Sequence, residues 1–144
     1  MAPDPDFVLD GLSIWIEGRE FPDSDDFWDG NWLRVRALML THGARVECTG
    51  PFLRNNDLLK FRNSLSEAHA KTAGTCVLES LEYNLRIELA VNPLNGQVSG
   101  MIAITPDIVL QKHEFDISLD QSHFPNLIAS FDAILERFPI IGSR

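Results

Sequence analysis

The chain has 144 residues, of which 44% are hydrophobic, and its formal net charge is −9. This length supports one core of ordinary size, so we expect a single domain over residues 1–144. It contains no run of about 18 apolar residues, and its first residues lack the basic and apolar regions of a signal peptide, so we expect a cytoplasmic protein without a membrane span.

The negative charge is concentrated at one end of the sequence. Residues 1–30 hold nine acids and one base, a balance of −8, whereas residues 31–144 hold twelve acids and eleven bases, a balance of −1. An acidic surface repels phosphate backbones and anionic lipids, and it attracts basic surfaces. The distribution argues against nucleic acid and membrane as partners, while an acidic end that serves solubility alone stays open as the alternative.

The first part of the chain has the patterns of strands. Phe7–Ile16 is apolar and β-branched and predicts one strand, with Gly11 as the place for a bend. Residues 21–31 are rich in aspartate and helix breakers and predict a loop.

A hairpin is predicted next. Trp32–Leu40 and Ala44–Thr49 alternate apolar and polar residues on either side of a turn at His42–Gly43. Gly50–Pro51 is expected to end the second strand, because proline cannot donate a ladder hydrogen bond.

Two helices and four further strands follow. A helix is predicted over Asn56–Thr72, capped by Asn55, Asn56 or Asp57 and stopped by Gly74, and a second begins at Pro125 and is ended by Pro139. Between them, alternation and a reversal at Asn95–Gly96 predict strands at Cys76–Glu82, Leu85–Val91, Gln97–Thr105 and His113–Leu119.

The order of three strands, helix, four strands, helix indicates an α+β protein with a mostly antiparallel sheet. We expect one strongly curved sheet or two packed sheets, with both helices against an apolar face or edge. Periodicity predicts burial of the following side chains: Leu33, Val35, Ala37, Val46, Ile87, Leu89, Phe115, Ile117, Leu58, Phe61, Leu65, Ile128, Phe131 and Leu135. The two cysteines, Cys48 and Cys76, lie in apolar segments and are expected to be buried free thiols.

No catalytic or metal-binding motif is evident. His42, His69, His113 and His123 have no zinc-site spacing, and the aspartates before Gly30 do not follow the ligand pattern of a calcium loop. Nucleophile turns, phosphate loops and dinucleotide fingerprints do not occur. We therefore expect no enzyme activity, no cofactor and no metal.

Trp28 and Trp32 lie in or beside the predicted acidic loop and do not belong to the apolar face defined by Leu33 and Val35. Large aromatics are enriched at binding surfaces, and they also cap the ends of cores, so both interpretations stay open for each tryptophan. Arg34 and Arg36 share the strand face of Trp32 and can pair with acids across the sheet. The predicted partner-binding residues are Asp23, Asp25, Asp26, Trp28, Asp29 and Trp32.

Three segments resemble the WapI-type bacterial immunity proteins. They are Asp26–Val35 (DFWDGNWLRV), Ser80–Leu85 (SLEYNL), and Leu119–Ser122 (LDQS) leading into a helix that ends Phe138–Pro139. The resemblance covers nearly the whole chain. It implies neutralisation of a cognate toxin domain by direct binding, and it supplies no catalytic residues.

Two other functions stay open. A curved sheet with a helix across it can enclose a cavity for a small apolar ligand, and a cavity of several hundred cubic ångströms would favour that function. A hydrolase would need converging carboxylates, for which the strand residues Glu79, Glu82, Glu88, Glu114 and Asp116 are available without a pattern that selects two of them.

Overall fold

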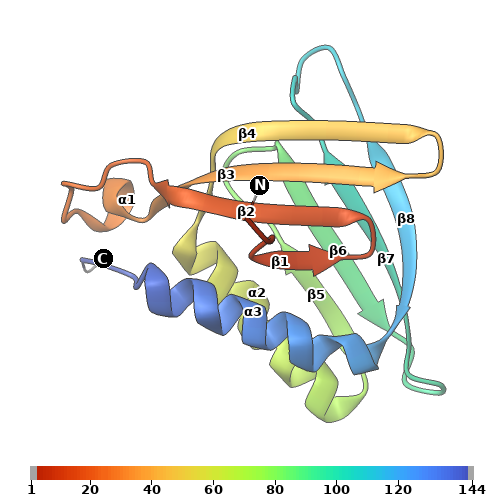
Figure 1. The fold of residues 1–144 in the computed structure, drawn as a ribbon. Helices are drawn as coiled ribbons and strands as arrows, with labels where there is room; N and C mark the ends of the chain where they lie inside the picture. Colours follow the sequence, from red (N-terminus) through yellow and green to blue (C-terminus); the bar gives the residue numbers. More distant parts are fainter. Residues whose placement is uncertain (1–2, 143–144) are drawn as a thin grey trace.

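The protein, seen in a computed structural model that describes residues 3–142, consists of two four-stranded antiparallel sheets and three α-helices (Figure 1). Sheet A has the strand order β1 (Phe7–Leu9), β2 (Leu12–Arg19), β3 (Trp32–Thr41), β4 (Ala44–Arg54). Sheet B has the order β5 (Gly74–Leu78), β6 (Leu85–Val91), β7 (Gln97–Ile104), β8 (Glu114–Asp120). The helices are α1 (Phe27–Gly30), α2 (Asn55–Lys71) and α3 (Phe124–Arg137), the last preceded by the 3-10 turn η1 (Gln121–His123).

The predicted α+β class and the antiparallel pairing are confirmed. Every strand pairs with its neighbour in sequence, so each sheet is a meander built from reversals such as the one at Gly96, where φ is 71°. Of the two predicted arrangements, the chain adopts two sheets, and neither is strongly curled. Helix α2 packs on β5 and on α3, and α3 packs on β1 (Figure 1).

One hydrophobic core draws on both sheets and on α2 and α3. Phe131 of α3 is fully buried, and its ring lies 4.6 Å from that of Phe7 and 5.5 Å from that of Phe61. Of the predicted core residues, Phe115, Ile128 and Leu135 are only partly buried against the core, because they lie toward the rims of β8 and α3, and the other eleven are buried. Cys48 and Cys76 are buried free thiols, as predicted, and burial raises the pKa of both.

The single strand predicted over Phe7–Ile16 is wrong. The chain reverses at Asp10 and Gly11, so this segment forms the hairpin of β1 and β2. Asp10 has a φ of 52°, and a Cβ on Gly11 would lie 2.1 Å from the carbonyl oxygen of Leu40. Because glycine has no Cβ, Gly11 allows β3 to approach the chain closely at the reversal.

The predicted end of the second hairpin strand at Gly50–Pro51 is also wrong. Strand β4 continues to Arg54, with a register shift opposite Leu33 and Val35. Since β4 is an edge strand of sheet A, proline is tolerated there, and the irregular register accommodates it.

Smaller differences concern element ends. Helix α2 runs over Asn55–Lys71, one residue earlier at each end than predicted, because Thr72 takes a left-handed conformation with φ of 51° and ends it before Gly74. The strand predicted over Cys76–Glu82 is instead β5, which ends at Leu78. Residues 79–84 therefore form a loop. Among the described helices, none combines the length and apolarity that a membrane span requires.

Candidate functional site

The predicted partner-binding residues lie together between β2 and β3. Asp23, Asp25 and Asp26 precede α1, Trp28 and Asp29 lie in it, and Trp32 begins β3. We call residues 23–32 the acidic segment. It projects from one end of sheet A beside the C-terminal residues (Figure 1).

The acidic segment is more ordered than a loop. Residues 21–31 were predicted to be a loop, yet they contain α1, because Asp26 caps its first turn. Its Oδ2 accepts hydrogen bonds from the backbone amides of Trp28 at 3.1 Å and Asp29 at 3.0 Å. Asp26 therefore has a structural role that the other aspartates of the segment do not share.

Asn31 anchors the base of the acidic segment. It is fully buried, and its Nδ2 donates to the carbonyl oxygens of Phe27 at 2.8 Å and Ile141 at 3.0 Å. Its Oδ1 accepts from the amide of Ile141 at 3.0 Å. A Cβ on Gly30 would lie 2.9 Å from the backbone carbonyl oxygen of Ser24, closer than side-chain carbons normally approach, so glycine is favoured here.

Two more polar side chains hold the C-terminal residues in place. Arg19 Nη1 donates to the carbonyl oxygen of Gly30 at 2.8 Å, and its Nη2 donates to that of Pro139. Nδ2 of the buried Asn55 donates to the carbonyl oxygen of Phe138 at 3.0 Å. The acidic segment is thus a preorganised surface tied to residues more than a hundred positions away in sequence.

Replacing Asn31 with Ala is expected to lower the free energy of unfolding by about 1–3 kcal/mol, because the change removes a fully buried side chain and leaves the part-buried amide of Ile141 without its partner. Urea unfolding measures this change. Hydrogen exchange should also become faster at the amides of Trp28 and Asp29. The matched control is Asn63→Ala on the exposed face of α2, which is expected to have little effect on either measurement. Equal stability of the two variants would contradict the anchoring role of Asn31.

The two tryptophans differ in exposure. Trp28 is 52% exposed, and its ring makes an edge contact with Phe27 at 5.1 Å. Trp32 is half-buried, and the guanidinium of Arg54 lies 5.3 Å from its ring centroid. Trp28 is therefore the more exposed of the two tryptophans.

Arg34 and Arg36 form ion pairs with acids that lie outside the acidic segment. Arg34 faces Glu17 at 3.8 Å and Glu20 at 3.6 Å, and Arg36 forms an ion pair with Glu47 at 3.1 Å. This confirms the expected pairing of both arginines with acids across the sheet. Asp23, Asp25 and Asp29 are exposed and take part in no ion pair within residues 3–142. Their charges are available to a basic surface.

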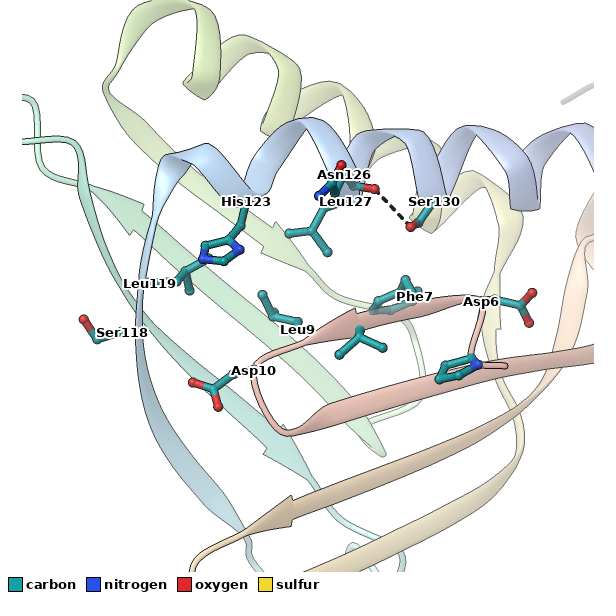
Figure 2. Close-up of a pocket in the computed structure, with 12 residues that line it drawn as sticks. Asp6, Phe7, Leu9, Asp10, Ser118, Leu119, His123, Asn126, Leu127 and Ser130 are labelled. Atoms are coloured by element: carbon teal, nitrogen blue, oxygen red, sulfur yellow. Dashed lines mark hydrogen bonds between the residues drawn. The ribbon is translucent and has the colours of Figure 1, made fainter. Parts of the chain in front are cut away.

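A pocket of about 550 Å³ lies between β1, β8 and α3 (Figure 2). Phe7, Leu9 and Leu127 supply apolar surface, while Asp10 and His123 add polar groups. Its volume is in the range typical of ligand pockets. The pocket lies at the edges of the two sheets, and the residues between the sheets belong to the continuous core.

The strand carboxylates show no convergent arrangement. Glu88 pairs with Arg86 at 2.7 Å, Glu114 with Lys112 at 3.5 Å, and Glu79 lies 3.9 Å from Arg86. Such pairs are ordinary for the outer face of a sheet. Over residues 3–142, no three histidine, cysteine or acidic side chains are grouped so that they could hold a metal ion.

Fold and site together define an α+β protein of two antiparallel meanders that presents an ordered acidic segment with an exposed tryptophan. The chain belongs to the immunity protein WapI-like family, whose sequence model matches residues 8–139. A search of curated proteins finds no match.

Two plant proteins are among the similar solved structures. WHY1 from Arabidopsis thaliana has 15% sequence identity and a TM-score of 0.48, with 88% of this chain and 83% of that chain covered. The plant transcriptional regulator PBF-2 has 13% identity and a TM-score of 0.48, with 88% of this chain and 75% of that chain covered. At these values neither likeness bears on function.

Proposed function

We propose that this protein is a non-catalytic immunity protein that neutralises a bacterial toxin domain by binding it directly in the cytoplasm. Membership of the immunity protein WapI-like family supports this function. The proposed contact is the acidic segment, and the proposed partner surface is basic. In this proposal the protein binds neither nucleic acid nor membrane, because both carry negative charge that the acidic end repels.

The ordered presentation of Trp28 together with Asp23, Asp25 and Asp29, which have no ion-pair partner within residues 3–142, is the observation that supports this interface. Asp26 and Asn31 hold the backbone of the segment, so little conformational freedom is lost when a partner binds. Exposed acids raise the association rate with a basic surface, and a desolvated aromatic slows dissociation. The segment combines both kinds of group within ten residues.

Co-expression with a toxin tests the function. Candidate toxin domains from genes neighbouring this one are expressed in Escherichia coli with and without the chain, and growth is followed together with complex formation by size-exclusion chromatography. We expect rescue of growth and a stable complex. Toxicity that persists at full expression of the folded protein would refute the immunity function.

Trp28→Ala is expected to weaken toxin binding by about 2 kcal/mol or more, mainly through faster dissociation, because the exposed indole is the apolar centre of the proposed contact. Surface plasmon resonance with the immobilised toxin domain measures the rates. The matched control is Leu40→Ala, which removes a side chain of similar exposure, 50%, toward the far end of β3. Equal dissociation rates for the two variants would remove Trp28 from the interface.

Binding of a small apolar ligand is a second candidate, favoured by the pocket between β1, β8 and α3 (Figure 2). Native mass spectrometry of protein purified from cells tests it. A bound lipid-sized molecule that is lost in Leu127→Trp, a change that fills the pocket, would support this function. Purified wild-type protein without any bound molecule would oppose it.

A further inference from the structure

Exposed apolar side chains gather in two loops at one end of sheet B. The loop between β5 and β6 carries Leu81, 66% exposed, and Tyr83, 73% exposed. The loop between β7 and β8 carries Val109, 86% exposed, and Leu110, 82% exposed. We call these four residues the apolar loop pair. Isolated exposed apolar residues are normal, but a group of them often marks an interaction surface.

Hydrogen bonds fix both loops. The amide of Thr105 donates to the carbonyl oxygen of Asn84 at 2.9 Å, and Asn84 Nδ2 donates to the carbonyl oxygen of Thr105 at 2.9 Å, so the two loops are joined where they leave the sheet. Oδ1 of Asp107 accepts from the amides of Val109 at 3.0 Å and Leu110 at 3.1 Å. The four apolar side chains are therefore carried by ordered backbone.

The Ser80–Leu85 segment is buried at its two ends and exposed at Leu81, Glu82 and Tyr83 between them. Ser80 and Leu85 are 8% and 1% exposed, whereas Leu81 and Tyr83 point outward. The buried Oγ of Ser80 has no hydrogen-bond partner within residues 3–142. A buried hydroxyl without a partner is unfavourable, and an incoming polar group can satisfy it.

A cleft lies beside the loop between β5 and β6. It has a volume of about 400 Å³, and its lining includes Arg54, Lys60, Ser80, Leu81 and Tyr83. The guanidinium of Arg54 is held by Asp57 at 3.4 Å and lies over the ring of Trp32, the last residue of the acidic segment. One surface thus runs from the acidic segment across Trp32 and Arg54 to Leu81 and Tyr83.

The charges beside Leu81 indicate the chemistry of the partner. Glu82 follows Leu81 directly, and Glu79 lies two residues before it; both are exposed. Glu79 lies 3.9 Å from Arg86, whereas Glu82 takes part in no ion pair within the described part of the chain. An apolar patch with acids at its border complements an apolar patch with bases at its border. The acidic segment is also complementary to a basic partner surface.

We propose that the apolar loop pair is a second contact region for the toxin domain that the acidic segment attracts, with Leu81 and Tyr83 as its anchors. This inference rests on the proposed function. The acidic segment accelerates the encounter, and the apolar loop pair, together with the cleft beside it, slows dissociation. The partner surface carries apolar side chains next to lysine or arginine.

The test compares toxin binding by wild-type protein, Leu81→Ser/Tyr83→Ser, Val109→Ser/Leu110→Ser and the control Leu94→Ser. Leu94 is 94% exposed in the turn between β6 and β7, at the opposite end of sheet B. All substitutions are at exposed sites and leave the net charge unchanged, so the fold, checked by circular dichroism, and the association rate should be preserved. Surface plasmon resonance measures the rates for the toxin domain that the co-expression test identifies.

We expect both double variants to bind at least about ten-fold more weakly, through faster dissociation, while Leu94→Ser binds like wild type. Wild-type affinity of Leu81→Ser/Tyr83→Ser would overturn the second contact region and leave the immunity function standing. Failure of the wild-type protein itself to bind would overturn both. Sedimentation velocity adds a further check, since a wild-type dimer that this variant dissociates would show that the loops contact a second copy of the chain, contrary to the proposal.

Discussion

Replacing Phe131 with Ala is expected to lower the free energy of unfolding by about 3–5 kcal/mol. The ring is fully buried where α3 meets α2 and β1, and it touches Phe7 and Phe61. The core cannot collapse around the missing ring without moving these elements apart, so the loss includes a cavity as well as the transfer of the ring to water. Urea or thermal unfolding followed by circular dichroism measures the change.

This loss is a large part of the stability of a domain of this size, which is typically about 5–15 kcal/mol. The matched control is Phe21→Ala, which removes the same ring from a site that is 48% exposed, and it should cost less than about 1 kcal/mol. A loss at Phe131 no larger than at Phe21 would show that α3 is not packed as described.

Changing Asp23, Asp25 and Asp29 to Asn is expected to slow association with the toxin domain about ten-fold or more at low salt. These side chains are exposed and take part in no ion pair within residues 3–142, so their replacement removes attraction without breaking structure. Asp26 is left in place because it caps α1. Stopped-flow measurements at several salt concentrations should show a flatter salt dependence for the variant, with a dissociation rate close to that of wild type.

The control for this variant makes the same change in net charge elsewhere. Asp10, Glu67 and Asp116 are exposed and lie in the β1–β2 turn, the C-terminal half of α2 and β8, so changing them to their amides removes three negative charges outside the acidic segment. The control should bind much faster than the acidic-segment variant. Equally slow association of both variants would show that net charge, and not this segment, determines the association rate. The acidic segment would then serve solubility only.

Side-chain periodicity determined most of the fold of this protein. Alternation along Leu33, Val35 and Ala37 and helical spacing of Leu58, Phe61 and Leu65 are local properties, and each set is buried in the structure as predicted. The free, buried state of Cys48 and Cys76 follows from the same apolar context. The concentration of acids in the first thirty residues likewise needs no structure to be seen.

Contacts between segments distant in sequence decided the rest. The reversal at Gly11 depends on β3, which approaches closely at Leu40, and the continuation of β4 past Pro51 depends on its place at the edge of sheet A. Short-range patterns contain neither fact, because they do not show which strand lies beside a residue.

The candidate site was also predicted in part from local sequence signals and decided in part by tertiary contacts. Sequence reasoning placed Asp23, Asp25 and Asp29 in a polar surface loop, since charge and breaker residues are local signals, but it left open whether Trp28 caps the core or lies at the surface. It missed Asn31, whose role arises from hydrogen bonds to Ile141, and it assigned Leu81 to a strand that in fact ends at Leu78. The local sequence does not show whether an asparagine is buried or a leucine is exposed to solvent. The tertiary structure decides both, because it determines which distant residues lie beside each side chain.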